Sequence, residues 1–246
     1  MKSNFFCQKP LANIYAKPSI KSEITSQILF GEKFKVIKKE KKWLKIKTDY
    51  DRYVGYLQND KFIKYFKPSH KIYKLKTTIY KKIKNKFLPS KKNLFFGSKI
   101  SIINKTEKFI QFNKNQWIRK KDVKSVKYYE KNFLKILNLF LGTKYLWGGK
   151  SSLGIDCSAL VQIFFFFNNE YFPRDTKDQI RFLKKIKDHK RYKKNILLYW
   201  KGHVAICLNK KNLIHAYGPK KKVIIMNINN TIKEIKRNAK LSLKIL

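Results

Sequence analysis

The sequence predicts an α+β protein, in which a β-rich first half precedes a half that combines helices with an antiparallel sheet. Short apolar runs, which nearly alternate with polar residues and are separated by turn residues, fill the chain before about residue 128. Apolar residues at spacings of three and four over residues 128–141 predict a helix that ends at Gly142. An apolar run at 159–167 predicts a second, buried helix, and two β-type runs follow at 202–208 and 213–218.

The first half contains a weak internal repeat. Strand-like runs occupy residues 28–37, 43–48 and 53–57, with turn residues between them. The tripeptides at 13–15 and 29–31 recur at 78–80 and 95–97, an offset of 65 or 66 residues. Such a repeat indicates a duplicated module. Because a small module needs large side chains to fill its interior, its main aromatic residues are expected in the core: Trp43, Tyr56 and Trp117.

The second half is organised around the stretch YLWGGKSSLGIDCSALVQ at residues 145–162. Glycines and serines lead to Asp156 and Cys157, and the apolar run begins at Ala159. This order predicts a loop that turns into a helix with Cys157 in its first turn. Unpaired backbone N–H groups and the helix dipole favour an anion at that end of a helix. The sequence therefore predicts a thiol that ionises readily and acts as a nucleophile.

A cysteine nucleophile also needs a base and a group that orients the base. The β-type runs at 202–208 and 213–218 are separated by a turn-like segment, so they predict a hairpin that carries His203 and His215. Antiparallel pairing can bring these histidines side by side. The remaining histidines, His70 and His189, lie in lysine-rich surroundings and are expected at the surface.

Four motifs in this half, YLWGG-x4-GIDCSALVQ, FPRDTKDQ, GHVAI and LIHA, resemble the NlpC-type cysteine peptidases of bacterial cell-wall metabolism in content, order and spacing. The resemblance covers residues 131–237 and implies a papain-like fold. It also implies that Cys157 is the nucleophile, His203 the general base and acid, and His215 the orienting residue, with Tyr145 near the oxyanion hole. The sequence departs from the family pattern outside this triad, at Ala159, Asn195 and Cys207, and Cys207 is expected in the core.

The N-terminal repeats resemble the bacterial Src-homology-3-like (SH3-like) barrels that commonly precede NlpC-type domains. The expected organisation is an SH3-like β-barrel at residues 1–66, a second one at 67–124 and a papain-like peptidase domain at 125–246. The resemblance implies that the barrels bind peptide or shape the catalytic cleft.

The same resemblance implies a substrate. Proteins with two such barrels before an NlpC-type domain cut the γ-D-glutamyl bond to a diamino acid in peptidoglycan-derived peptides, often after a free N-terminal L-alanine, in murein peptide recycling. The residues implied to bind that peptide and its amine are Asp156, Ser158, Asp175 and Thr176. Two alternatives stay open: a non-catalytic protein that binds wall peptides, and an amidase or acyltransferase that uses the same triad.

The net charge is +44, from 59 basic and 15 acidic side chains. Such a charge can attract polyanions, but the lysines are spread along the chain and arginine is scarce, so no specific nucleic-acid partner is expected. The scattered cysteines predict neither a disulfide framework nor a zinc site, and no metal or cofactor is expected. The first residues lack the apolar run of a signal peptide, and no stretch reaches membrane-spanning length, so a cytoplasmic location is expected.

Overall fold

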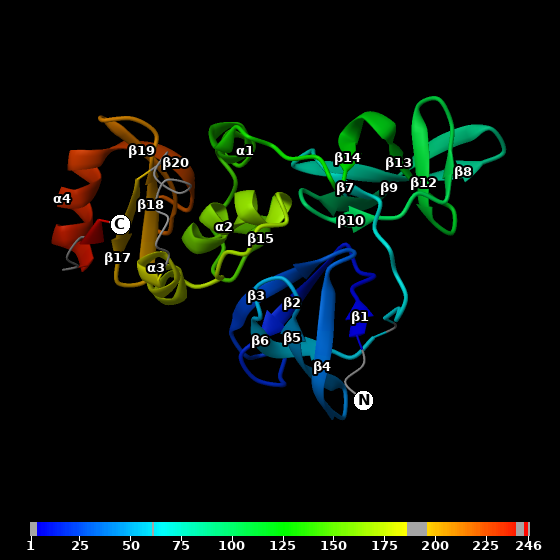
Figure 1. The fold of residues 1–246 in the computed structure, drawn as a ribbon, viewed down its shortest axis with the longest axis horizontal. Coiled ribbons are helices and arrows are strands. Elements are labelled where there is room, and N and C mark those ends of the chain that lie inside the picture. The colour runs from blue at the N-terminus through cyan, green and yellow to red at the C-terminus, as the bar shows by residue number, and fades with distance from the viewer. Residues whose placement is uncertain (1–3, 61, 186–195, 240–243, 246) are drawn as a thin grey trace. The chain divides into compact units, whose positions relative to one another are not determined.

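The computed structural model describes residues 4–60, 62–185, 196–239 and 244–245. The chain forms two compact units, Met1–Glu130 and Lys131–Leu246 (Figure 1). The N-terminal unit is built of β-strands, and the C-terminal unit packs helices on an antiparallel sheet. This arrangement confirms the α+β class. The domain boundaries after residues 66 and 124 stay predictions.

The first barrel is an antiparallel sheet with the strand order β1-β4-β5-β6-β2-β3. Its core is a cluster of buried apolar side chains that includes Ile14 and Phe34. Trp43 and Tyr56, which were expected in the core, are only half-buried, and Trp43 packs edge-on against Tyr15 at 5.2 Å. The strands are β1 (Asn4–Phe6), β2 (Leu11–Tyr15), β3 (Ile24–Leu29), β4 (Lys33–Glu40), β5 (Trp43–Thr48) and β6 (Val54–Gln58).

The residues of the predicted second barrel form two sheets, with the strand orders β10-β7-β14 and β11-β12-β13-β8-β9. Trp117 is buried, as expected, and packs against Phe87. His70 was expected at the surface but lies half-buried in β7, and His189 lies outside the described residues. The elements are β7 (His70–Ile72), β8 (Lys76–Ile83), β9 (Lys86–Phe95), β10 (Lys99–Ile100), β11 (Asn104–Lys105), β12 (Phe109–Asn113), β13 (Gln116–Arg119), the 3-10 helix η1 (Lys120–Asp122) and β14 (Val123–Ser125).

The internal repeat has a structural counterpart in the turns that follow β3 and β9. Gly31 and Gly97 hold equivalent left-handed positions, with φ angles of +77° and +82°. In each turn the next side chain, Glu32 or Ser98, accepts a hydrogen bond from the backbone N–H three residues earlier, at 2.8 and 3.3 Å. A Cβ atom on Gly31 would lie 2.0 Å from the carbonyl oxygen of Lys99, so this turn has room only for glycine.

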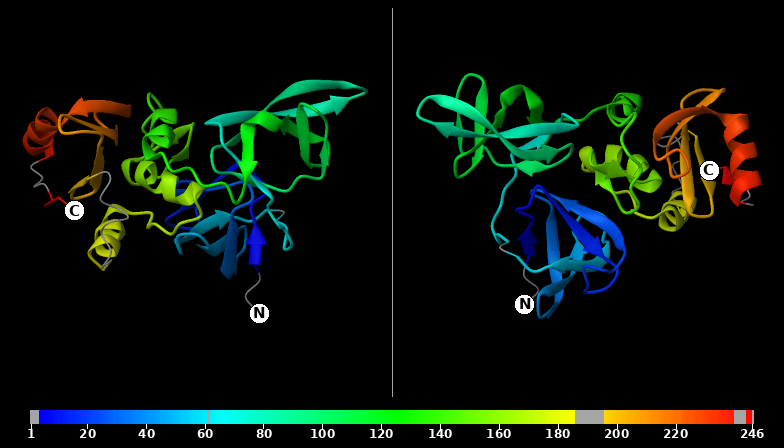
Figure 2. Two further views of the ribbon diagram at one scale, coloured as in Figure 1. Left: turned by 45° about the horizontal axis from the view of Figure 1, so that its top comes forward. Right: turned by 180° about the vertical axis from the view of Figure 1, so that it is seen from behind.

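The C-terminal unit has a sheet with the strand order β20-β19-β18-β17-β21. Helix α2 packs against β18 and β19, and α1 packs against α2. Helices α2 and α3 lie on one side of the sheet and α4 on the other (Figures 1 and 2). The elements are α1 (Phe133–Leu139), β15 (Lys150–Ser151), β16 (Gly154–Ile155), α2 (Cys157–Phe167), α3 (Thr176–Lys185), β17 (Leu197–Trp200), β18 (His203–Cys207), β19 (Asn212–Tyr217), β20 (Lys222–Asn227), α4 (Ile228–Ala239) and β21 (Lys244–Ile245).

Two details of this unit differ from expectation. Helix α1 is shorter than the predicted 128–141, because the Asn132 side chain accepts a hydrogen bond from the N–H of Lys135 and caps the helix there. Just before it, Glu130 accepts hydrogen bonds from the hydroxyls of Tyr73 and Tyr128. Cys207, expected in the core, is half-buried and packs at the edge of the apolar cluster of the sheet.

Candidate active site

Helix α2 begins at Cys157, as the sequence predicts, and Asp156 is its N-cap. The backbone of Asp156 is extended, and its carboxylate accepts a hydrogen bond from the N–H of Ala159 at 2.8 Å. A carboxylate at this position satisfies an unpaired donor and complements the positive end of the helix dipole. Most of the helix beyond it is buried. Cys157 therefore lies on an element that the packing holds in place.

The Cys157 thiol is only 3% exposed, and its Sγ lies 3.9 Å from the carbonyl oxygen of Gly202. Burial raises the pKa of this thiol to about 12, and the charge of Asp156 adds to that effect. The backbone N–H groups of Val204 and Ser158 donate to the sulfur and lower the pKa, but by less. The increase in pKa caused by burial is therefore larger than the decrease expected at the start of a helix. The expectation of a readily ionised thiol is wrong for the resting protein.

The predicted hairpin forms, with β18 and β19 antiparallel and Ile206 opposite Ile214. It places Nε2 of His203 3.0 Å from Nδ1 of His215. Nε2 of His215 lies 3.2 Å from Sδ of Met226. Burial lowers the pKa of His203 to about 4 and that of His215 to about 3, the latter also through the charge of His203. Both imidazoles are therefore neutral near pH 7, and each can donate at only one nitrogen.

The Cys157 thiol contacts backbone atoms of the two residues that flank His203. Among the described residues, no hydrogen bond joins the Cys157 thiol to His203 directly. The sulfur instead contacts the backbone on either side of that histidine, at Gly202 and Val204. Catalytic hydrogen bonds are often long in unliganded sites and shorten when substrate binds. Nε2 of His203 is engaged in the hydrogen bond with His215, so Nδ1 of His203 is the nitrogen that can accept the thiol proton.

Arg174 holds the N-cap of the nucleophile helix, a role that the sequence pattern did not indicate. Its guanidinium makes a bidentate pair with Asp156, with Nη2 2.6 Å from Oδ2 and Nη1 3.0 Å from Oδ1. It also donates to Oγ of Ser158 at 2.8 Å, and that hydroxyl donates to Asp156 Oδ1 at 3.1 Å. The N–H of Gly148 donates to the same carboxylate. Asp156 and Ser158 are therefore joined in one buried network.

The other predicted site residues surround this network to different degrees. Tyr145 is half-buried, and its pKa is raised by burial and then by the charges of Cys157 and Asp156. Asp175 is exposed and directly precedes α3, and Thr176 is the first residue of that helix and half-buried. Their roles toward a substrate stay predictions.

A second buried network lies beneath α2, and the sequence pattern did not indicate it. The amide of Gln179 donates to the carbonyl oxygens of Ser158 and Pro173, each at 3.0 Å. Its Oε1 accepts a hydrogen bond from the Tyr199 hydroxyl at 3.1 Å. Burial and the charge of Cys157 both raise the pKa of Tyr199, which keeps its proton as a donor. The network ties the first turn of α2 to α3 and β17.

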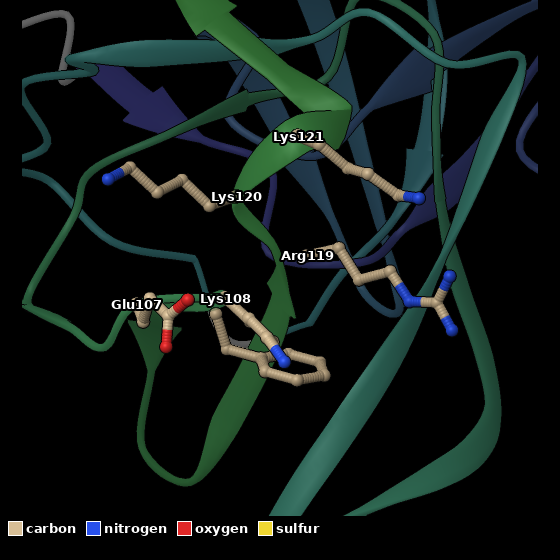
Figure 3. A pocket seen from close by; sticks show the side chains of 6 residues that line it. Glu107, Lys108, Arg119, Lys120 and Lys121 are labelled. Carbon is tan, nitrogen blue, oxygen red and sulfur yellow. The ribbon is translucent and has the colours of Figure 1, made fainter.

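A cavity of about 550 Å³ lies in the N-terminal unit, beside β12 and β13. Figure 3 shows the Lys120 and Lys121 side chains extending to opposite sides of it. Its lining is mostly basic: Glu107, Lys108, Phe109, Arg119, Lys120 and Lys121. In the part of the chain that the structure describes, no group of His, Cys, Asp or Glu is placed to hold a metal ion. No helix within these same residues is long and apolar enough to cross a membrane.

Comparisons with known proteins identify two domains in the chain. Residues 142–238 match the NlpC/P60 family, and residues 14–62 match the bacterial dipeptidyl-peptidase Sh3 domain. Dipeptidyl-peptidase 6 of Lysinibacillus sphaericus is 28% identical over 84% of each chain. Gamma-D-glutamyl-L-lysine dipeptidyl-peptidase of Bacillus subtilis is 26% identical over 86% of this chain and 78% of its own length.

Solved structures show the same fold. A crystal structure of an NlpC/P60 family protein from Bacillus cereus has a TM-score of 0.75 and 18% identity, and the match covers 92% of this chain and 95% of that one. The chain thus has the papain-like fold, with SH3-like structure before it. It carries an NlpC/P60 cysteine peptidase domain at residues 142–238, preceded by a bacterial dipeptidyl-peptidase Sh3 domain at residues 14–62.

Proposed function

We propose that this peptidase hydrolyses the bond between γ-D-glutamate and the diamino acid in peptides derived from peptidoglycan, with Cys157, His203 and His215 as its triad. The observation that carries the proposal is the 3.0 Å hydrogen bond between the two imidazoles, next to a buried thiol at a helix start. The substrate class is supported by the relatives that are named dipeptidyl-peptidase 6 and gamma-D-glutamyl-L-lysine dipeptidyl-peptidase.

The reaction begins from a neutral pair, because burial raises the pKa of Cys157 and lowers that of His203. Nδ1 of His203 takes the thiol proton as Sγ bonds to the amide carbonyl carbon. His203 then gives this proton to the leaving amine, the C–N bond breaks and a thioester remains. Water attacks the thioester while His203 takes its proton and returns it to Sγ. His215 keeps the His203 ring in the required orientation throughout.

The tetrahedral intermediate needs donors for its oxyanion. The backbone N–H of Cys157 is one, and the Tyr145 hydroxyl, which keeps its proton because burial raises its pKa, is the second. Such donors are already in place before the charge develops, and removing one typically costs about 10²–10³ in rate.

The free amine of the peptide is received by Asp156, Ser158, Asp175 and Thr176. Asp156 already pairs with Arg174, so its charge is largely balanced within the protein. Asp175 is the more exposed of the two carboxylates. It therefore supplies the direct charge pairing to the ammonium group, while Asp156 holds Ser158 in place.

The test is mass spectrometry of L-Ala-γ-D-Glu-diaminopimelate incubated with the purified protein, beside its N-acetylated form and the L-lysine analogue. We expect release of L-Ala-D-Glu from the free-amine peptides alone. Cys157→Ala should abolish the release, and Cys207→Ala, a matched change at a half-buried thiol, should not. Cleavage of both the free and the acetylated form would indicate a wall endopeptidase. Binding without cleavage would favour a non-catalytic protein, and cleavage of other amides an amidase or acyltransferase.

A dipeptidyl-peptidase that needs a free amine acts on released peptides, so we place this protein in the recycling of murein peptides in the cytoplasm. Cell fractionation with an antibody to the full chain tests this placement. Recovery of the protein outside the cell or with the wall would contradict it.

A further inference from the structure

His215 has a second polar neighbour besides His203. Its Nε2 lies 3.2 Å from Sδ of Met226, on strand β20 next to β19. In this pair of strands Leu213 is opposite Met226 and His215 is opposite Ile224, so the methionine reaches His215 diagonally. A line of contacts therefore runs from His203 through His215 to Met226.

The protonation of this line has two possible arrangements. A neutral imidazole donates at one ring nitrogen and accepts at the other. If Nε2 of His203 donates to Nδ1 of His215, then Nδ1 of His203 is a base and His215 carries its proton on Nε2. If the bond runs the other way, Nδ1 of His203 carries a proton and cannot accept one from Cys157.

The sulfur of Met226 distinguishes the two arrangements. A thioether is a weak acceptor and has no hydrogen to donate. In the first arrangement, the Nε2–H of His215 points at this acceptor. In the second, an unprotonated Nε2 faces a sulfur lone pair at 3.2 Å, which is repulsive. The methionine therefore favours the arrangement in which His203 is a base toward the thiol.

We infer that Met226 is a positioning residue, which fixes the tautomers of His215 and His203 so that Nδ1 of His203 can accept the thiol proton. The inference rests on the proposed triad. Tyr217 also contacts His215, with the rings stacked at 4.5 Å and 11°. A ring face does not distinguish between the two nitrogens, so this stacking fixes the ring plane and leaves the choice of tautomer to Met226.

Met226 is the sole methionine of the chain besides Met1, so replacing methionine during protein production changes only these two positions. Production with norleucine replaces Sδ by a methylene group of similar size and removes the acceptor. Production with selenomethionine keeps a lone pair and is the matched control, since Met1 is exchanged in both proteins. We expect the norleucine protein to lose about threefold to tenfold in kcat at unchanged KM, the effect of one weak hydrogen bond, and the selenomethionine protein to keep its kcat.

The same exchange is made genetically with Met226→Leu, which lacks the acceptor, and Met226→Gln, whose amide oxygen restores one. Nitrogen-15 NMR of histidine-labelled protein reads the tautomers without any turnover. We expect the Nε2–H form for both rings, and a larger Nδ1–H fraction in the norleucine protein. Equal kcat in the norleucine and selenomethionine proteins, or a proton on Nδ1 of His203 in the unmodified protein, would overturn the inference.

The failure of the proposed triad would look different. Turnover that survives in Cys157→Ala would remove the proposed function. The NMR comparison would still decide whether Met226 sets the tautomers of the histidine pair.

Discussion

Arg174 makes a bidentate ion pair with Asp156, and both side chains are almost completely buried, at 2% and 6% exposure. Asp156 caps the helix that begins with Cys157, so the guanidinium holds the nucleophile through one intermediate residue. A buried charge that loses its partner is costly, because neither water nor another group replaces the lost interaction.

Replacement of Arg174 by methionine should therefore lower the free energy of unfolding by about 3–5 kcal/mol. Urea unfolding of the full chain measures this change. Arg181→Met is the matched control, because Arg181 pairs with Asp178 at the surface, with 62% and 55% exposure. An exposed pair contributes little, so the control should change stability by less than about 1 kcal/mol. Equal effects of the two substitutions would show that the buried pair has no special role.

His203→Ala should reduce kcat by about 10²–10⁴, because it removes the general base and acid. His215→Ala leaves the base in place and loses only its orientation, so a smaller loss, about 10²-fold, is expected. Steady-state kinetics with the free-amine tripeptide measures both. A larger effect at His215 than at His203 would reverse the roles assigned to the two histidines.

Tyr199→Phe should lower the free energy of unfolding by about 1–3 kcal/mol. The substitution removes the hydroxyl that donates to Gln179 and leaves the buried Oε1 of that amide without this donor. Thermal unfolding measures the change. Tyr171→Phe, at a side chain with 45% exposure, is the control and should have little effect. No difference between the two variants would mean that the buried amide finds another donor.

Stability should fall as the pH is lowered from about 6.5 to about 4. The folded protein holds His203 and His215 with pKa values lowered by burial to about 4 and about 3, whereas the unfolded chain titrates near 6.5. In this window the unfolded chain binds more protons, so acid favours unfolding, by at most about 1.4 kcal/mol per pH unit for each imidazole. His215→Gln should reduce the slope of unfolding free energy against pH. An unchanged slope would contradict burial as the cause.

The sequence indicated much of this fold because several elements depend on local patterns. The capped helix at Cys157, the hairpin of His203 and His215 and the repeated glycine turns each follow from residues close together in the chain. The predicted helix at 128–141 began too early because the sequence pattern did not show that the Asn132 side chain caps the helix. A periodic pattern predicts that a helix is present more accurately than it predicts where the helix begins and ends.

What the sequence by itself determined is the set of reactive side chains and the elements that carry them. The tertiary structure decided what surrounds those side chains. Arg174, Gln179, Tyr199 and Met226 reach the site only because α2, α3 and the sheet pack together. The same packing buries Cys157 and raises its pKa, although its position at a helix start alone would lower it. Desolvation is set by every neighbour in space, so no local stretch of sequence reveals it.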